Sequence, residues 1–196
     1  MVFKLKGRFI FFATNNVNKF DEARRVLADY KITVGMLRVK TAEIQSDSLT
    51  EIAETSVKDA FQKCGLPIIV EDAGLFVDGL NGFPGPYAAY VYKTIGNRGL
   101  LKLMRGNEKR KAKFMSVIAY FSRGLKSPIC FSGLASGEIV AEERVGSGRT
   151  GFGFDPVFRP DTSHKTFAEM DVTEKNRNSH RADALRKFAE WYKKAP

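Results

Sequence analysis

Two adjacent carboxylates, Glu71 and Asp72, are the residues of this sequence best placed to do chemistry. They follow an apolar run at residues 68–70 and precede Ala73 and Gly74. An apolar run bounded by polar and turn residues predicts a buried strand, here one that stops at the two acids. In open α/β sheets, ligands gather beyond the carboxyl ends of the strands. The pattern therefore predicts acid groups at the mouth of a site, although an isolated Glu-Asp pair also fits a simple strand end.

A second candidate is a polar stretch near the start of the chain. Residues 8–13 predict a buried strand, and residues 14–19 predict a turn into a helix with one apolar face. The N–H groups and positive dipole end of such a helix favour an anion, and Lys19 adds a full charge. Thr14 and Asn16 would then contact phosphate, or they would serve only as helix caps. The residues alone allow both interpretations.

The composition predicts a globular protein. The 196 residues, 43% of them hydrophobic, suffice for one well-buried domain or for two small lobes that share a sheet. No apolar run is long enough to cross a bilayer, and the first residues lack a signal peptide, so we expect a cytoplasmic protein without a membrane partner. Cys64 and Cys130 form no metal or disulfide framework, and we expect two buried thiols.

The net charge of +10 would attract polyanions, which include nucleic acids and small phosphate esters. The basic residues are dense only at 108–113 and 191–194, and no nucleic-acid-binding motif accompanies them. We therefore expect a solvated surface at each cluster and no stable nucleic-acid partner.

Further elements follow from the periodicity of the chain. A strand is predicted at 32–37, an amphipathic helix begins at Leu49, and residues 65–67 end it. Residues 79–87 are rich in Gly and Pro and predict a loop without helix or strand. Helix is predicted at 87–106, divided into two segments by residues 96–99. Residues 114–121 and 128–140 predict an antiparallel second lobe, and 146–156 a glycine-rich loop. A C-terminal helix begins near Ser179.

Together these stretches resemble the inosine triphosphatase family, the noncanonical purine nucleoside triphosphate pyrophosphatases. The resemblance covers nearly the whole chain and rests on five motifs in the expected order. They are Thr-x-Asn-x-x-Lys at 14–19, Glu-Asp-Ala-Gly-Leu at 71–75, Gly-Phe-Pro-Gly-Pro-Tyr at 82–87, Phe-Gly-Phe-Asp-Pro at 152–156, and Glu-Lys-Asn at 174–176 followed by Ser-His-Arg at 179–181.

The resemblance implies a mixed α/β fold over residues 1–196, with two lobes that share a long twisted sheet and a nucleotide cleft between them. It also implies a homodimer that uses Mg²⁺ to hydrolyse ITP, dITP and XTP to the monophosphate and pyrophosphate. Such an enzyme removes deaminated purines from the nucleotide pool.

The resemblance further implies roles for individual residues. Asp72 would be the general base, and the metal ligands would be Glu43, Glu71 and Asp72. The residues expected to bind the substrate are Thr14, Asn16, Lys19, Ala73, Phe152, Gly153, Phe154, Asp155, Lys175, Ser179, His180 and Arg181. Many relatives carry a lysine where this chain has Ser56, and Lys58 lies on another face of the helix. Either Lys58 substitutes for that lysine through a rotation of the helix, or the phosphate contacts depend on Lys19 and Lys175.

Two rival functions need consideration. A nucleic-acid binder would explain the charge and the aromatic loop, but it has no need of acids at Glu43, Glu71 and Asp72. A related pyrophosphatase for modified pyrimidine triphosphates is disfavoured only by the resemblance at residues 179–181. The acids themselves suit Mg²⁺, which takes one or two carboxylates plus phosphate oxygens and waters.

Overall fold

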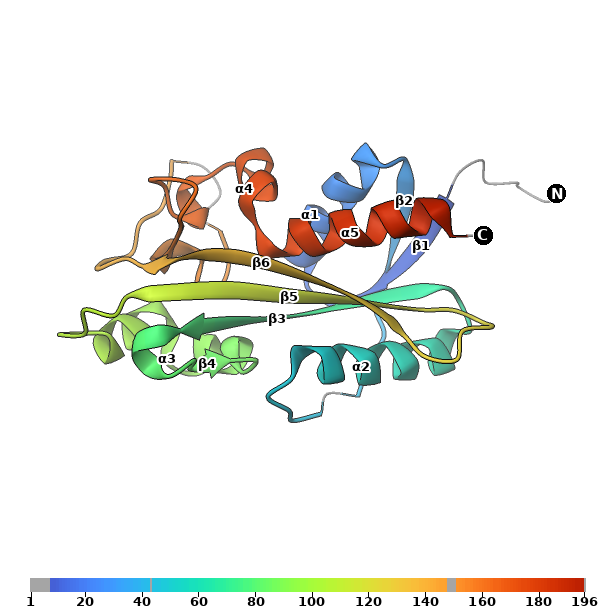
Figure 1. The fold of residues 1–196 in the computed structure, drawn as a ribbon, viewed down its shortest axis with the longest axis horizontal. Helices are drawn as coiled ribbons and strands as arrows, with labels where there is room; N and C mark the ends of the chain where they lie inside the picture. Colours follow the sequence, from blue (N-terminus) through green and yellow to red (C-terminus); the bar gives the residue numbers. More distant parts are fainter. Residues whose placement is uncertain (1–7, 43, 148–150, 196) are drawn as a thin grey trace. The chain divides into compact units, whose positions relative to one another are not determined.

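The computed structural model describes residues 8–42, 44–147 and 151–195 and shows a mixed α/β protein (Figure 1). Its seven described strands form one sheet in the order β2-β1-β3-β5-β6-β7, and β4 pairs with β3 off this path. The mixed α/β class expected from the sequence is confirmed.

The strands alternate with helices in the first part of the chain and follow one another later. The strands are β1 (Arg8–Ala13), β2 (Ile32–Leu37), β3 (Ile68–Val77), β4 (Pro84–Gly85), β5 (Lys111–Phe121), β6 (Ile129–Ile139) and β7 (Phe158–Pro160). The helices are α1 (Val17–Asp29), α2 (Leu49–Cys64), α3 (Ala88–Leu103), α4 (Val172–Asn178) and α5 (His180–Lys194). Short 3₁₀ turns lie at Asp78–Leu80, Asp155–Val157 and Phe167–Glu169.

The chain divides into two compact units. The first comprises Met1–Asp72, Val117–Ser132 and Ala182–Pro196, and the second comprises Ala73–Ser116 and Gly133–Arg181. Each unit has its own hydrophobic core. The division passes between Asp72 and Ala73, within strand β3.

In the first unit, β1 pairs in parallel with β2 and with β3. Tyr120 and Phe121 are neighbours on β5 that pack against different helices. The ring of Tyr120 lies 5.9 Å from that of Phe188 on α5, and the ring of Phe121 lies 5.1 Å from that of Phe61 on α2. Because successive strand residues point to opposite faces, α5 and α2 cover opposite faces of the sheet in this unit (Figure 1).

In the second unit, α3 packs into a core that contains Leu75, Leu100, Met104 and Phe158. The predicted division of this helix is confirmed at Gly96, whose φ of 62° and ψ of −166° interrupt the helical backbone. A positive φ of this size favours glycine.

The prediction that the central strand stops at Asp72 is wrong, because β3 continues to Val77. Leu75 and Val77 extend the apolar pattern into the core, and the antiparallel strand β4 pairs with this extension. Gly74 is a strand residue here rather than a turn signal. A Cβ at Gly74 would lie 2.6 Å from the carbonyl oxygen of Gly85, so the close approach of β4 requires glycine.

Other expectations need smaller corrections. The segment 79–87 contains part of a 3₁₀ turn and strand β4, and is therefore not wholly loop. Cys64 and Cys130 are half-buried rather than buried. Burial, with a smaller contribution from Glu54, raises the pKa of the Cys130 thiol to about 11, so this thiol is protonated at neutral pH.

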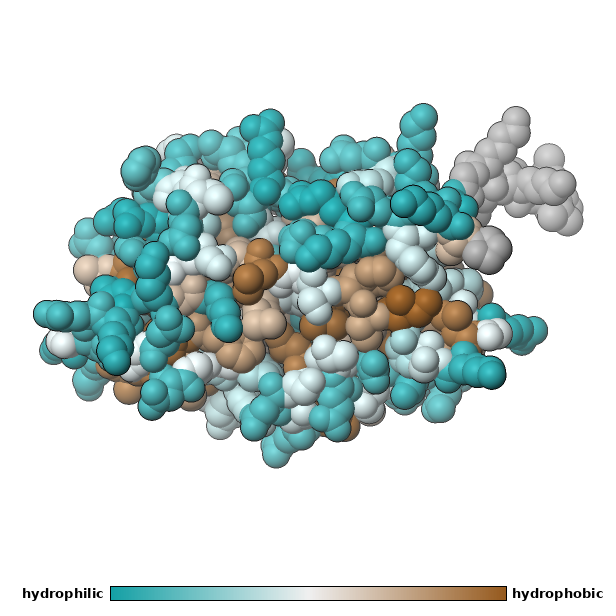
Figure 2. Space-filling model, in the orientation of Figure 1, coloured by the Kyte–Doolittle hydropathy of each residue, from teal (hydrophilic) through white to brown (hydrophobic). Residues whose placement is uncertain are grey.

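Hydrophilic side chains cover much of the face shown in Figure 2, as expected for a chain with 28% charged residues. Within the described ranges, no helix combines the length and the apolar character needed to span a membrane.

Candidate functional site

The expected site residues fall into two groups, one in each unit. The first unit contains Thr14, Asn16, Lys19, Glu71 and Asp72. The second contains Ala73, Phe152, Gly153, Phe154, Asp155, Lys175, Ser179, His180 and Arg181. The expected metal ligand Glu43 lies outside the described residues.

The polar turn after β1 caps helix α1. The side-chain oxygen of Asn16 accepts hydrogen bonds from the backbone N–H groups of Asn18 and Lys19, at 3.0 and 3.2 Å. The hydroxyl of Thr14 accepts one from the backbone N–H of Asn16 at 3.1 Å. Asn16 is therefore the N-cap of α1, and the N–H groups of Asn18 and Lys19 are already used. A phosphate at this end would rely on side chains, chiefly that of Lys19.

Lys19 forms an ion pair with Glu71. Its Nζ lies 2.7 Å from Oε2 of Glu71 and donates to the Glu71 carbonyl oxygen at 3.4 Å. The Glu71 side chain is 0% exposed and that of Lys19 is 21% exposed. The parallel register Phe12↔Ile69 explains the contact, because Thr14 and Glu71 each follow two residues later. The topology therefore brings the helix start and the strand acid together.

Asp72 is half-buried on β3 next to Glu71. Successive side chains of a regular strand point to opposite faces, so the two carboxylates are directed differently.

The segment before Glu43 is tied to helix α2. Ser56 is buried, and its hydroxyl donates to the Ala42 carbonyl at 3.0 Å. The Ala42 N–H donates to Asp59 at 2.7 Å, and Lys63 donates both to Asp59 and to the Lys40 carbonyl. The hydrogen bond from Lys63 holds the pKa of Asp59 below its usual value, and the Ala42 N–H adds to this effect. Ser56, at the position where the resemblance leads us to expect lysine, therefore has a structural contact with Ala42.

In the second unit, Lys175 and Asp155 form a buried ion pair. The Nζ of Lys175 lies 2.5 Å from Oδ2 of Asp155, and the two side chains are 6% and 4% exposed. The same oxygen accepts the backbone N–H of Phe152 at 2.8 Å. Lys175 is positioned by the short helix α4, which Asp171 caps through a reciprocal capping box with Glu174.

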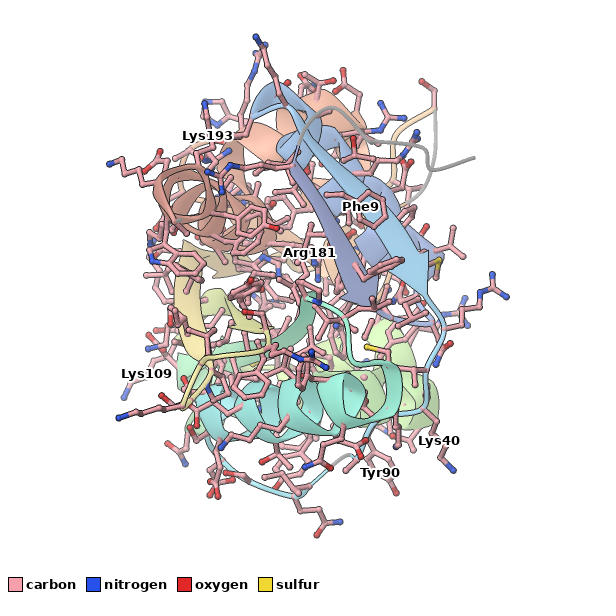
Figure 3. All side chains as sticks on the ribbon, turned by 90° about the vertical axis from the view of Figure 1, so that its right-hand side faces the viewer. Phe9, Lys40, Tyr90, Lys109, Arg181 and Lys193 are labelled. Atoms are coloured by element: carbon pink, nitrogen blue, oxygen red, sulfur yellow. The ribbon has the colours of Figure 1, made fainter. Side chains whose placement is uncertain are left out.

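The ring of Phe152 lies near two cationic groups. Lys175 Nζ is 4.5 Å from its centroid, and the guanidinium carbon of Arg181 is 5.4 Å from it. Arg181 is buried at the start of α5 and is labelled in Figure 3. The Phe152 ring can stack on a planar base, and the cationic groups of Lys175 and Arg181 can donate to oxygens of that base.

His180 opens helix α5 and stacks on Phe114, with ring centroids 4.6 Å apart and an interplanar angle of 9°. Phe114 in turn packs against Phe158 and Phe167. These supporting rings were not singled out from the sequence, because only the fold brings β5, β7 and the 3₁₀ turn before α4 to His180.

The donor set suits a hard divalent cation. No group of three or more His, Cys, Asp or Glu side chains is found within residues 8–42, 44–147 and 151–195. Glu71 and Asp72 offer carboxylate oxygens, and a hard cation can complete its shell with phosphate oxygens and waters. Glu71 and Asp72 could therefore contribute to a site for an ion that also binds a phosphate substrate.

Comparison with known proteins gives consistent matches along the chain. The model of the Ham1 family matches residues 10–191. The dITP/XTP pyrophosphatase of Methanopyrus kandleri is 50% identical over 184 residues, which cover 94% of this chain and 96% of the relative. The dITP/XTP pyrophosphatase of Thermococcus kodakarensis is 50% identical over 182 residues, covering 93% and 96%.

Solved structures agree with the sequence matches. A HAM1 protein from Coxiella burnetii has a TM-score of 0.83 and 29% identity, covering 96% of this chain and all of the other. The Staphylococcus aureus Ham1 protein has a TM-score of 0.80 and 27% identity, covering 95% and 99%. This chain therefore belongs to the Ham1 family.

Proposed function

We propose that this protein hydrolyses the noncanonical purine nucleoside triphosphates ITP, dITP and XTP to the monophosphate and pyrophosphate. Its relatives are named dITP/XTP pyrophosphatases. The observation that carries the proposal is the buried cluster of Lys175, Asp155 and Arg181 around Phe152. A half-buried aromatic ring with buried cationic groups beside it suits a purine that carries an oxygen at position 6.

For the phosphate end, we propose that Thr14, Asn16 and Lys19 bind the triphosphate and that Asp72 is the general base. The buried contact between Lys19 and Glu71 supports a site at the start of α1 where charges of both signs meet. Lys19 would offset negative charge that develops on the phosphate oxygens. Asp72 would accept the proton of the attacking water, the role of a positioned carboxylate in general base catalysis.

We propose Mg²⁺ as the cofactor, held by Glu71 and Asp72, with Glu43 as a further ligand by resemblance. When bound, it would neutralise phosphate charge and polarise the phosphorus. The remaining chemistry falls to the residues of the chain. Lys19 and Mg²⁺ would compete for the Glu71 carboxylate. Lys19 would therefore have to exchange its contact with Glu71 for one with a phosphate.

For the base end, we propose that Phe152 stacks on the purine and that Ala73, Gly153, Phe154, Ser179 and His180 complete the pocket. Lys175 and Arg181 would donate to the base, and Asp155 would hold these donors or accept a ring N–H. Hypoxanthine and xanthine present an oxygen at position 6, whereas adenine presents an amino group there. The amino group of adenine would present a donor to these cationic groups, where hypoxanthine and xanthine present an acceptor.

We further propose one domain of two lobes that share the sheet, a homodimer, and a cytoplasmic location. The homodimer is supported by large apolar side chains that are exposed in the second unit, among them Tyr90 (Figure 3), Phe83 and Tyr87. Exposed apolar side chains that gather in one stretch of chain are typical of contact surfaces.

Substrate selectivity provides the test. We expect kcat/KM for ITP and XTP to exceed that for ATP at least about a hundredfold, since each hydrogen bond between a charged donor and a base oxygen contributes about 1.5–3 kcal/mol. The values should also exceed that for GTP. Arg181→Ala should narrow the gap between ITP and ATP, measured from initial rates with each nucleotide.

Arg177→Ala is the matched control, because Arg177 is an exposed cation on α4, four residues before Arg181. The control should leave the ratio of ITP to ATP unchanged. Equal hydrolysis of ITP and ATP by the unmodified protein would overturn the assignment of the base pocket.

A further inference from the structure

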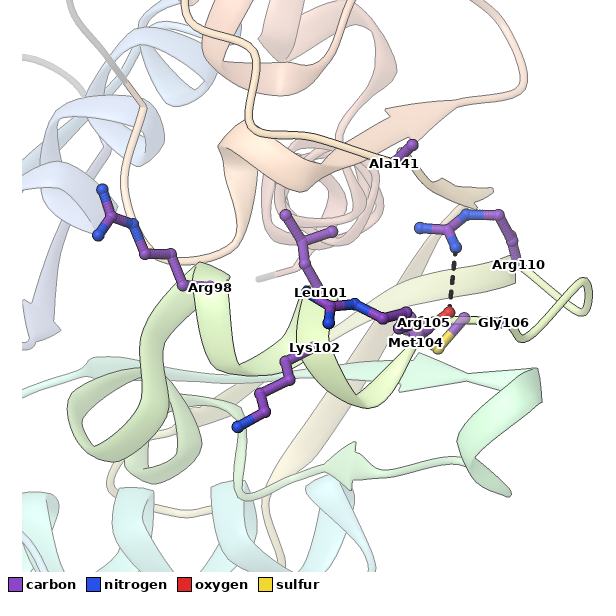
Figure 4. A pocket seen from close by; sticks show the side chains of 8 residues that line it. All are labelled: Arg98, Leu101, Lys102, Met104, Arg105, Gly106, Arg110 and Ala141. Atoms are coloured by element: carbon purple, nitrogen blue, oxygen red, sulfur yellow. Dashed lines mark hydrogen bonds between the residues drawn. The ribbon is translucent and has the colours of Figure 1, made fainter.

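A second, strongly cationic pocket lies in the second unit and shares no residue with the proposed active site. It is hollowed between the end of α3, the segment before β5 and the chain after β6, and its volume is about 530 Å³ (Figure 4). The residues that line it are Arg98, Leu101, Lys102, Met104, Arg105, Gly106, Arg110 and Ala141. Four of these lining residues carry a positive charge, and none of the lining residues is acidic.

Three of the cations come from one stretch of chain at helical spacing. Arg98 and Lys102 lie four residues apart on α3, and Arg105 follows three residues later, just after the helix ends. All three are exposed, and none of them makes an ion pair with another residue of the described ranges. Like charges at this spacing repel one another, so their arrangement is unfavourable unless an anion is present.

The fourth cation, Arg110, is fixed in the pocket wall. Its Nε donates to the Ile139 carbonyl at 2.6 Å, Nη2 donates to the Val140 carbonyl at 2.6 Å, and Nη1 donates to the Met104 carbonyl at 3.4 Å (Figure 4). A guanidinium has five N–H groups, so two stay available beyond these three bonds. Arg110 therefore contributes a positive charge that needs no ordering when a ligand binds.

A smaller pocket in the same unit, of about 330 Å³, shows what an ordinary charged surface looks like in this protein. There Lys111 pairs with Asp161 at 2.9 Å, and Arg159 pairs with Glu138 at 2.6 Å. Its cations are neutralised by neighbours within the pocket lining. The basic residues at 108–113 thus have different surroundings. Lys111 is paired with Asp161, Lys109 extends outward (Figure 3), and Arg110 lines the cationic pocket.

The dipole of α3 explains only part of this charge. Cations are favoured at the C-terminal end of a helix, which accounts for Lys102 and Arg105. Arg98 lies more than a turn before that end, and Arg110 belongs to the next segment. The dipole therefore does not account for all four cations that line this pocket.

We propose that this pocket binds a small anion that carries two or more phosphate groups. Four positive charges without an acid exceed what one phosphate would neutralise. The volume lies in the range of pockets that hold small organic ligands. Leu101 and Ala141, which are half-buried and exposed, provide an apolar wall for a non-phosphate part such as a nucleoside. The arginines offer the planar forked donors that suit phosphate oxygens.

The test is a calorimetric titration with inorganic pyrophosphate in the presence of a chelator, which suppresses binding that depends on a metal. Arg98→Glu/Arg105→Glu should weaken binding at least about tenfold, because it reverses two of the four charges. Lys93→Glu/Lys126→Glu is the control, since it changes the net charge equally at exposed cations outside the pocket. The control should bind within about twofold of the unmodified protein.

Hydrolysis of ITP by the Arg98→Glu/Arg105→Glu variant should stay within about twofold of the unmodified protein, which separates this pocket from the active site. Equal weakening of pyrophosphate binding in both double variants would show that only the net charge of the protein matters, and would overturn the proposal. Unchanged binding in both double variants would also overturn it. A single-stranded oligonucleotide that displaces pyrophosphate, and that loses affinity only in the pocket variant, would assign the pocket to nucleic acid instead.

Discussion

Asp72→Asn is expected to lower kcat for ITP about a hundredfold or more while leaving KM nearly unchanged. Asparagine keeps the shape of aspartate but cannot accept a proton at neutral pH. The variant should therefore bind substrate and fail in the step that activates water. Steady-state rates of ITP hydrolysis, measured as pyrophosphate released, provide the test.

A titration with Mg²⁺ separates the two roles proposed for Asp72, general base and metal ligand. If Asp72 is the base, kcat stays low at saturating Mg²⁺, whereas the loss of a metal ligand would be restored in part by more metal. Asp78→Asn is the control, because Asp78 is an exposed acid just after the same strand. A variant that keeps more than half of the normal kcat would show that another group activates the water.

Lys175→Met is expected to destabilise the protein by about 3–5 kcal/mol, the usual cost of removing one partner from a buried ion pair. Met fills a similar volume but leaves the carboxylate of Asp155 uncompensated in a buried position. Unfolding in urea, followed by circular dichroism, would measure the free energy. Activity toward ITP should fall as well, because the donor beside Phe152 is lost.

Lys165→Met is the matched control, since Lys165 pairs with Glu174 at 2.9 Å where the side chains are 51% and 39% exposed. Surface pairs of this kind contribute little to stability, so the control should be nearly as stable as the unmodified protein. Adding Asp155→Asn to Lys175→Met should recover part of the lost stability, because it removes the buried charge. A small and equal effect of both single lysine variants would mean that the buried pair is not a stabilising contact.

The elements that could be predicted from the sequence are those with a strong local pattern. The strand at 32–37 matches β2, and the apolar periodicity after Leu49 matches α2. In contrast, α4 was not predicted, because this helix has seven residues and almost no apolar periodicity, and a capping box at Asp171 supports it. The true end of β3 was missed because Gly74 reads as a turn until the approach of Gly85 is known.

The candidate site was predictable to a similar extent. Motif residues could be chosen by resemblance, and a cap at Asn16 was one of two local alternatives. The contact between Lys19 and Glu71 joins residues 52 positions apart, and no local pattern encodes it. The cationic pocket is another product of the fold, because Arg98 and Arg110 carry no mutual signal in the sequence. Pairings of this kind depend on tertiary packing rather than on local preference.

The most direct test of the proposed activity is an analysis of the first products formed from ITP. The protein would be incubated with ITP and Mg²⁺, and the products separated by ion-exchange chromatography, with an inorganic pyrophosphatase added or omitted and with a chelator in a third sample. Attack at the α-phosphate predicts IMP and pyrophosphate, orthophosphate only when the pyrophosphatase is present, and no reaction with the chelator. IDP and orthophosphate as the first products, formed without added pyrophosphatase, would contradict it.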